Sequence, residues 1–210
     1  MQLDNLKSQY FDGIYKTKAF IIKEEPFTLQ SGKKSHLYLN HRHFLSQSQY
    51  LTLIANIYHE LAKHLPYDYQ LGAVDSVTSP MIVGAMCALF NKNYVVIKNE
   101  PLKHGTQEYI YGNIQQPIIL IDDMTSTGST LIDAAEKIRS QGGTVDHAII
   151  SAYRDNTAIQ NLKSCGITLL CIASFSEIVI YLNDSLTENE RKLAKNELGD
   201  FLSLHTQQKE

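Results

Sequence analysis

The residues with the clearest chemical potential are two adjacent carboxylates followed by a run of small hydroxyl side chains. Asp122 and Asp123 come directly after the branched aliphatic stretch 118–121, and the hydroxyl run with its single glycine follows: Thr125, Ser126, Thr127, Gly128, Ser129 and Thr130. A loop entering a helix points free backbone N–H groups outward, and the helix dipole adds partial positive charge. This run therefore predicts a phosphate cradle. The carboxylates would repel a phosphate, but they suit sugar hydroxyls, a developing cation or Mg²⁺.

The expected ligand is a sugar that has a phosphate at one end and hydroxyl groups in the middle. A second interpretation stays open, because a charged strand end followed by an ordinary Ser/Thr helix cap would use the same residue types. The Gly-x-x-x-x-Gly-Lys loop of nucleoside triphosphatases and the Gly-x-Gly-x-x-Gly fingerprint of dinucleotide-binding proteins are both absent from the sequence. Their absence weakens those two functional classes.

Short apolar runs alternate with helical stretches from about residue 70 onward. We expect strands at 71–74, 94–97, 117–121, 147–151 and 167–172, and helices at 80–90, 130–140 and 156–164. Continuous apolar strands alternating with helices indicate an α/β fold with a doubly wound parallel sheet that is covered on both faces. Such sheets bind ligands beyond the carboxyl ends of their strands. The carboxylates and the hydroxyl run follow one of these strands, at the expected position of a ligand.

Before the sheet, the pattern predicts a smaller unit built from a helix and a hairpin. A helical stripe near the N-terminus is expected to break at Gly13, and the alternating arms of 27–39 predict a hairpin that turns at Ser31 and Gly32. A further amphipathic helix is expected around 50–61, and a charged one over 187–204, with Leu193, Leu198 and Phe201 facing inward. We assign 1–45 to an N-terminal hood and 46–210 to the α/β core of one compact domain.

Composition excludes several classes of protein. The 210 residues include 19 Lys and Arg against 22 Asp and Glu, so the net charge of -3 argues against a nucleic-acid partner. No apolar run reaches the about 20 residues of a membrane-spanning helix, and charged residues near the N-terminus argue against a signal peptide. The three cysteines form no regular framework and read as buried thiols, which favours the cytoplasm. The cluster His36, His41 and His43 reads as surface or hood packing rather than a metal site.

The stretch 118–130 resembles the phosphoribosyl pyrophosphate (PRPP) motif of type I phosphoribosyltransferases. Three further stretches, in the same order, resemble orotate phosphoribosyltransferases: the hood segment 27–35 with the following Tyr38-x-Asn40, the loop Glu100-x-x-x-His104-Gly105, and Arg154 after the next strand. The resemblance covers most of residues 20–160. It implies a type I phosphoribosyltransferase-like sheet with an N-terminal hood.

The resemblance also implies an activity, the joining of orotate to PRPP to give orotidine 5′-monophosphate and pyrophosphate, with Mg²⁺ bound mainly through PRPP. Carried over, Asp122, Asp123, Lys103 and His104 are catalytic, and Ser31, Gly32 and Arg154 hold the base. Lys98 and the residues 125–130 bind PRPP. The partners implied are PRPP, orotate or a related base, and a second copy of the chain in a homodimer with shared active sites, with no membrane.

Several positions depart from the family pattern. Lys98, Asn99 and Leu102 stand where the family has an Arg-Lys pair and a further lysine, and Lys103 lies one position away from the usual loop lysine. Gln30 replaces the hood lysine, and 75–80 lacks the glycine usual in a pyrophosphate loop. Two alternatives therefore remain: a phosphoribosyltransferase for another base, or a weakly active or non-catalytic binding protein on the same fold.

Overall fold

The computed structural model describes residues 2–29, 32–101 and 109–199. The elements of the N-terminal part run in the order α1 (Gln2–Thr17), β1 (Phe20–Thr28), β2 (Lys34–Leu39), α2 (His41–Leu45) and α3 (Ser48–Ala62). The remaining elements are β3 (Gln70–Ala73), α4 (Ser79–Phe90), β4 (Tyr94–Ile97), β5 (Ile110–Tyr111), β6 (Ile118–Ile121), β7 (Met124–Thr125), α5 (Ser129–Ser140), β8 (His147–Tyr153), α6 (Thr157–Ser164), β9 (Thr168–Ser174), α7 (Phe175–Leu182), the 3₁₀ turn Asn183–Ser185 and α8 (Glu188–Leu198).

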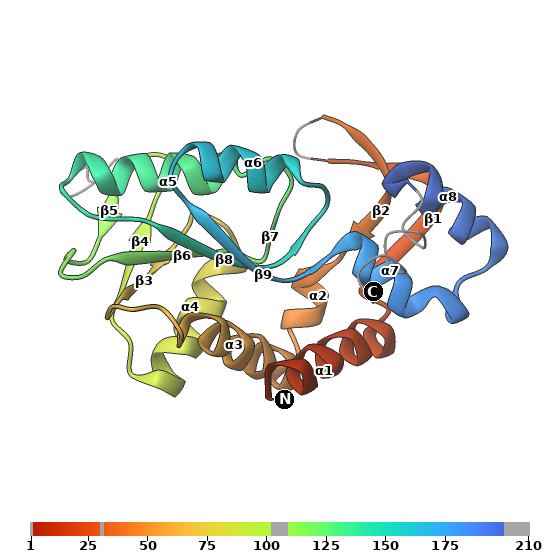
Figure 1. The fold of residues 1–210 in the computed structure, drawn as a ribbon, viewed down its shortest axis with the longest axis horizontal. Coiled ribbons are helices and arrows are strands. Elements are labelled where there is room, and N and C mark those ends of the chain that lie inside the picture. Colours follow the sequence, from red (N-terminus) through yellow and green to blue (C-terminus); the bar gives the residue numbers. More distant parts are fainter. Residues whose placement is uncertain (1, 30–31, 102–108, 200–210) are drawn as a thin grey trace.

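The central sheet follows the order β5-β4-β3-β6-β8-β7, and β9 also pairs with β8. All of these pairings are parallel except that of β5 with β4. Helices α5 and α6 cover one face, and α3 and α4 cover the other (Figure 1). The expected doubly wound α/β sheet is therefore confirmed. The ends of the expected strands differ from the observed ones by at most two residues, and the two-residue strands β5 and β7 were not expected.

Alternate residues of the buried strands feed two separate cores. Ile119 and Ile121 of β6 join the cluster on the α3/α4 side, whereas Ile118 and Leu120 join the cluster under α5 and α6. This alternation follows from the two-residue period of a strand. Both faces of β6 are therefore apolar and buried. The strand fixes the position of the following Asp122 and Asp123 at the carboxyl end of the central strands.

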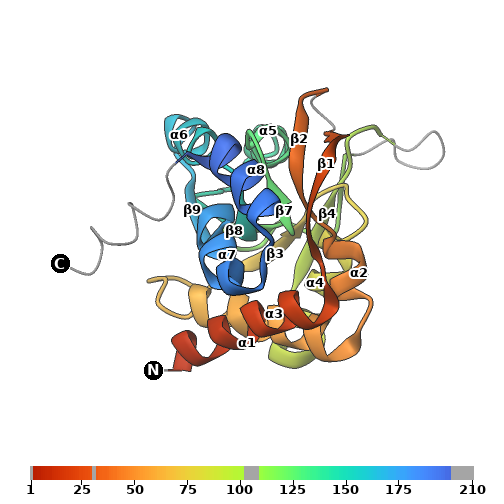
Figure 2. The same ribbon diagram turned by 90° about the vertical axis from the view of Figure 1, so that its right-hand side faces the viewer.

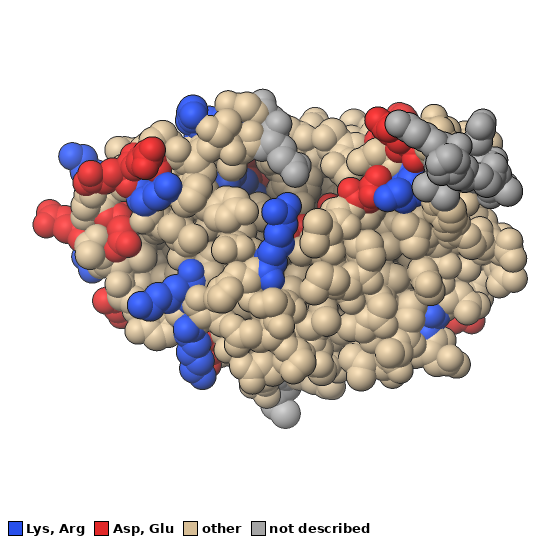
Figure 3. All heavy atoms as spheres, turned by 180° about the vertical axis from the view of Figure 1, so that it is seen from behind, with Lys and Arg blue, Asp and Glu red and all other residues tan. Residues whose placement is uncertain are grey.

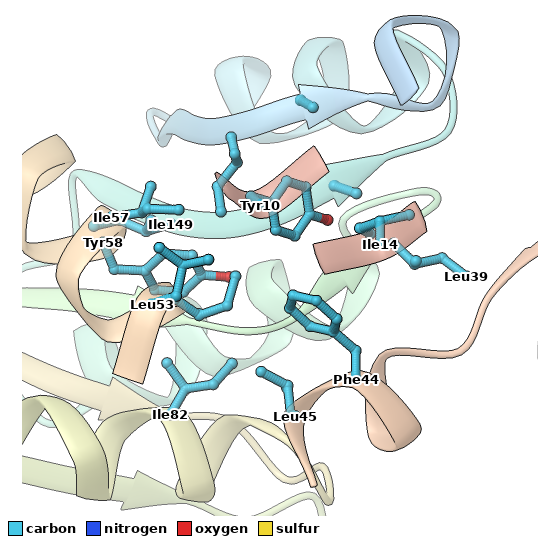
Figure 4. Packing of buried hydrophobic residues seen from close by; sticks show 14 of the residues in the cluster. Tyr10, Ile14, Leu39, Phe44, Leu45, Leu53, Ile57, Tyr58, Ile82 and Ile149 are labelled. Carbon is cyan, nitrogen blue, oxygen red and sulfur yellow. The ribbon is translucent and has the colours of Figure 1, made fainter. Parts of the chain in front are cut away.

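Hood and sheet are joined by one continuous apolar cluster. Tyr10 and Ile14 of α1 pack with Phe44 of α2, and the same cluster continues to Tyr58 of α3 and Ile149 of β8 (Figure 4). The division at residue 45 stays a prediction. The cluster spans both sides of it.

The predicted break of the first helix at Gly13 is wrong, because α1 continues to Thr17. A Cβ at Gly13 would lie 2.6 Å from Cε1 of Tyr50 and 2.9 Å from Cε2 of Phe44. The glycine thus allows α1 to approach α2 and α3 closely, at the usual cost of a glycine in a helix. Glycine at position 13 therefore reflects close packing between helices and does not mark the end of α1.

The C-terminal elements return to the hood. Helix α7, which the sequence analysis did not expect, begins with a capping box formed by Ser174 and Glu177. Helix α8 packs beside the β1–β2 hairpin (Figures 1 and 2). It ends at Leu198, and the rest of the expected helix, including Phe201, lies outside the described residues. Among the described helices, none is both long and apolar enough to cross a membrane.

Candidate active site

A cavity of about 870 Å³ lies between the hairpin and the carboxyl ends of the central strands. The core contributes the loops after β3 and β6, and the hood contributes residues from β1, β2 and α2. The described lining residues are Thr28, Leu29, Tyr38, Leu39, His41, Arg42, Asp75, Ser76, Val77, Thr78, Asn99, Asp122, Asp123, Met124, Thr125, Ser126, Thr127, Ser129, Thr130 and Arg154. This is the position at which a parallel sheet presents its ligands.

The hydroxyl run forms one end of the cavity, which we call the phosphate end (residues 125–130). Thr125 accepts a hydrogen bond at Oγ1 from the backbone N–H of Gly128, at 2.9 Å, and this bond closes the turn that starts α5. The N-cap residue of α5, Gly128, offers no side-chain cap, and only a long bond of 3.4 Å runs from the backbone N–H of Ser129 to Thr127 Oγ1. The N–H groups of the first turn of α5 are therefore directed toward the cavity, together with the hydroxyls of Thr125, Ser126, Thr127, Ser129 and Thr130, and the end has the chemistry of an anion site.

Gly128 is suited to the turn for two reasons: its backbone conformation and its lack of a Cβ. Its φ of 83° lies in the left-handed region, which residues with a Cβ rarely adopt. A Cβ there would meet Cγ of Leu162 at 3.0 Å, on the side of α6. Gly128 therefore allows α6 to pack against the turn, and the described cavity wall is formed by its neighbours rather than by Gly128 itself.

Asp122 and Asp123 form the floor of the cavity and differ in their surroundings. Asp122 is buried, and its Oδ1 accepts hydrogen bonds from Ser76 Oγ at 3.2 Å and from the backbone N–H of Asp123 at 2.9 Å. Burial, and then the charge of Asp123, raise the pKa of Asp122 to about 8. Burial alone would also raise the pKa of Asp123, but hydrogen bonds and charge from His41, with Thr78, outweigh it and lower that pKa below its ordinary value. The pair thus divides into a neutral and an ionised carboxyl group near pH 7.

His41 connects the hood to this floor. Its side chain is buried, and Nδ1 lies 3.5 Å from Oδ2 of Asp123. The ring is also within hydrogen-bonding distance of Ser151 Oγ, at 3.0 Å, and of the Tyr10 hydroxyl, at 3.3 Å, and it stacks on Phe44. The ring is therefore fixed from three elements.

Lys98 lies at the end of β4 and pairs with an acidic residue of the loop after β3. Its Nζ is 2.6 Å from Oδ1 of Asp75, whose Oδ2 accepts the backbone N–H of Asn99 at 3.0 Å. Burial would raise the pKa of Asp75, but the bonds from Lys98 and Asn99 lower it. The described wall contains Asp75 and Asn99 but not Lys98, so the ammonium group stands behind the wall in this arrangement.

Another part of the cavity wall, which we call the base end, is formed by the hairpin and Arg154. Thr28 and Leu29 come from one arm of the hairpin, and Tyr38 and Leu39 from the other. Arg154 follows β8 and is buried: Nη1 donates to Ser35 Oγ at 2.5 Å and to Glu197 Oε1 at 2.7 Å, and Nη2 donates to the carbonyl of Leu37 at 3.0 Å. Burial lowers the pKa of Arg154, and Glu197 opposes that shift.

The structure brings together most, but not all, of the residues that the sequence singled out. Asp122, Asp123, Arg154 and the hydroxyl residues of 125–130 line the same cavity. Gly32, with a φ of 80°, is exposed at the tip of the hairpin. Ser31, Lys103 and His104 lie outside the described residues. Among the described residues there is no group of three or more His, Cys, Asp or Glu side chains that could hold a metal ion. The expectation that Mg²⁺ binds mainly through PRPP stays a prediction.

Three contributors escaped the sequence analysis. His41 was interpreted as a packing residue, yet it contacts Asp123. Arg42, which follows it, places an exposed cation in the cavity wall. Glu197 lies on the charged helix expected over 187–204, but it was not among the positions expected to face inward. The Tyr38-x-Asn40 match directly before His41 was the available signal for the first two, whereas no local pattern marks Glu197.

Comparisons with known proteins identify the family of this chain. No protein-family model matches the chain. An orotate phosphoribosyltransferase of Sulfolobus acidocaldarius is 32% identical over 170 residues, which cover 80% of this chain and 85% of that protein. Another, of Streptococcus pyogenes, is 31% identical over 180 residues, 83% of this chain and 85% of that protein.

Solved structures share the fold at lower identity. Leishmania donovani UMP synthase matches 91% of this chain with a TM-score of 0.78 at 22% identity, and the match spans 42% of that longer chain. Orotate phosphoribosyltransferase from Aeropyrum pernix matches 82% of this chain and 97% of its own, with a TM-score of 0.70 at 22% identity. The curated relatives are more than 30% identical to this chain over most of both chains. This chain therefore belongs to the orotate phosphoribosyltransferase family.

Proposed function

We propose that the protein transfers the phosphoribosyl group of PRPP to orotate, releasing pyrophosphate and forming orotidine 5′-monophosphate for pyrimidine biosynthesis. The observation that carries the proposal is that one cavity gathers three kinds of group. An anion site at residues 125–130, a carboxylate floor at Asp122 and Asp123, and a base end at the hairpin and Arg154 all line it. These groups suit a phosphate, a ribose and a base.

The unequal carboxyl groups suit a substitution at the anomeric carbon. Positive charge develops on the ribose as the bond to pyrophosphate loosens, and an ionised Asp123 below the ring stabilises it electrostatically. A protonated Asp122 can donate a hydrogen bond to a ribose hydroxyl, which an ionised carboxylate cannot do. His41 keeps Asp123 ionised, so the hood contributes to the charge of the floor.

The charges around the floor suit a magnesium ion that arrives with the substrate. The oxygen donors in the wall are hard ligands, but Asp75, Asp122 and Asp123 already have protein partners. Mg²⁺ would therefore be held mainly by the pyrophosphate, and it would neutralise the leaving group. Lys103 and His104, which the resemblance places in the catalytic loop, and Lys98 remain proposed contacts to PRPP.

We also propose that two copies associate through the outer face of α4. This helix has no charged residue, and it exposes Met81 and Leu89. The nearby Val77 is 62% exposed, in the same loop that lines the cavity, so the partner copy would sit next to the active site. Figure 3 shows few Lys, Arg, Asp or Glu side chains on the right-hand part of the face seen from behind. Sedimentation of wild type and Leu89→Glu tests this: a wild-type dimer and a monomeric variant are expected.

The location in the cell stays a prediction. The three cysteines are free thiols, which suits a reducing compartment such as the cytoplasm, but they are partly exposed rather than buried as the sequence analysis expected.

The assay for the reaction is loss of orotate absorbance with PRPP and Mg²⁺. Consumption of orotate with one pyrophosphate released per orotate supports the proposal. Turnover of another base only would identify the second candidate, which the neutralisation of Arg154 by Glu197 favours because orotate is itself a carboxylate. Tight binding of PRPP with no turnover on any base of a panel would identify a non-catalytic protein.

A further inference from the structure

The carboxylate of Glu197, on the C-terminal helix α8, receives three donors from the base end. Its Oε1 accepts Nη1 of Arg154 at 2.7 Å and the hydroxyl of Ser35. Its Oε2 accepts the backbone N–H of His36 at 2.8 Å. Both oxygens are therefore used, and the partners come from β2 and from the segment after β8, far apart in the sequence.

Arg154 is fixed on all sides by this arrangement. Ser35 and Leu37 of β2 accept two of its three other Nη–H donors, and its guanidinium lies 4.6 Å from the ring centroid of Phe175. Only Nε has no hydrogen-bond partner among the described residues, although the atom is buried. A buried donor without a partner is costly, so this N–H, together with the remaining N–H of Nη2, is available to a ligand.

The position of Glu197 relative to the cavity decides its role. Arg154 belongs to the described wall of the cavity, whereas Glu197 does not. The carboxylate therefore stands behind the guanidinium and does not occupy the space of the base. A role as an internal competitor of an anionic base is excluded by this placement, and a role in orienting Arg154 remains.

We propose that Glu197 is a positioning residue for the acceptor base: it holds Arg154 with its remaining N–H donors, Nε–H among them, directed to the base and compensates the guanidinium charge, so that the base meets oriented donors instead of a free cation. Helix α8 is thereby part of the acceptor site. The inference rests on the proposed function, since it assumes that the base lies at this end.

Steady-state kinetics of full-length variants test the inference. Glu197→Ala removes both oxygens and is expected to raise KM for orotate by about 10-fold or more, a loss of about 1.4 kcal/mol, with KM for PRPP within twofold of wild type. Glu197→Gln retains one acceptor for Arg154 and should recover part of the loss. Glu188→Ala, in the exposed first turn of the same helix, is the matched control and should behave as wild type.

A purely structural role predicts a different pattern. In that case Glu197→Ala would lower Tm and change both KM values alike, or neither, and no recovery by Glu197→Gln would be specific to the base. Equal KM values for orotate in wild type and Glu197→Ala would overturn the proposal.

A second readout separates this inference from the proposed function. In ¹⁵N-labelled protein, the Nε–H of Arg154 should give a resonance protected from solvent exchange, identified by its absence in Arg154→Lys. Glu197→Ala should broaden or lose this resonance, while Glu188→Ala should keep it. If wild type consumes no orotate but the resonance depends on Glu197, the proposed function fails and the positioning stands. An unchanged resonance in Glu197→Ala overturns the positioning whatever the substrate.

Discussion

The two ends of the cavity are built in opposite ways. The phosphate end comes from one short stretch, in which Thr125 closes the turn onto Gly128 and α5 follows at once. The base end is assembled from the hairpin, from Arg154 and from Glu197, with partners separated by up to 162 positions in the chain. Local sequence therefore specifies where the phosphate binds, whereas tertiary packing specifies what the base meets. The floor, Asp122 and Asp123, is also specified by local sequence. The hood nevertheless affects it, because His41 lowers the pKa of Asp123.

The largest effect is expected from Asp123→Asn, which removes the ionised group of the floor. Because this group acts on the ribose, kcat should fall by about 10²–10³-fold, and by the same factor for every accepted base. Stopped-time assays of product formation measure it, with ribose 5-phosphate affinity as a check that the phosphate end is intact. Asp133→Asn, an exposed carboxylate of α5, is the control. A loss confined to one base would contradict a shared floor.

Gly128→Ala tests the local construction of the phosphate end. The substitution places a Cβ at a φ of 83° and 3.0 Å from Leu162, so we expect a loss of about 1–3 kcal/mol in the free energy of unfolding, with a raised KM for PRPP. Urea denaturation and kinetics measure the two quantities.

Gly142→Ala provides a matched control for the backbone conformation. Gly142 has a φ of 82°, but nothing lies within 4 Å of a Cβ built there. It should cost only the backbone term of roughly 1 kcal/mol and leave KM for PRPP unchanged. Equal losses in the two variants would show that contact with α6 contributes nothing at Gly128.

His41→Asn tests the connection between the hood and the floor. His41 lowers the pKa of Asp123, so its removal should raise that pKa and move the acidic limb of the pH profile of kcat/KM to higher pH. Activity at the optimum should fall by less than for Asp123→Asn. His43→Asn, exposed on the same short helix, is the control. A profile that does not move would mean that His41 only packs.

The sequence was sufficient for the parts that depend on neighbouring residues. The strand 118–121, the turn at 125–128 and the start of α5 follow from hydrophobic period, hydroxyl spacing and one glycine. The alternation of strands and helices likewise predicted the sheet. These features are set within a few residues, so no knowledge of the rest of the chain was required.

Features that depend on distant residues could not be predicted in this way. Gly13 looked like a helix stop because its close contact with Tyr50 is a tertiary fact. Helix α7 was missed because Ile178, Val179, Ile180 and Tyr181 favour strands, although the Ser174–Glu177 capping box was a usable signal. Glu197 resembled any other charge of a solvated helix until its pairing with Arg154 was known.

The smallest effect, and the finest test of the division within the floor, is the pH dependence of stability in Asp122→Asn. The folded pKa of Asp122, about 8, lies above its ordinary value, so the wild-type protein keeps a proton there that the unfolded chain has lost. The stability contributed by this proton is present at low pH and is lost as pH rises through about 8. Asparagine has no such charge. Relative to wild type, Asp122→Asn should therefore gain Tm between pH 5 and pH 9, whereas Asp146→Asn, at an exposed site, should show no such gain. A constant difference in Tm across this range would mean that Asp122 does not hold the buried proton. It would contradict the division of the floor into a neutral Asp122 and an ionised Asp123.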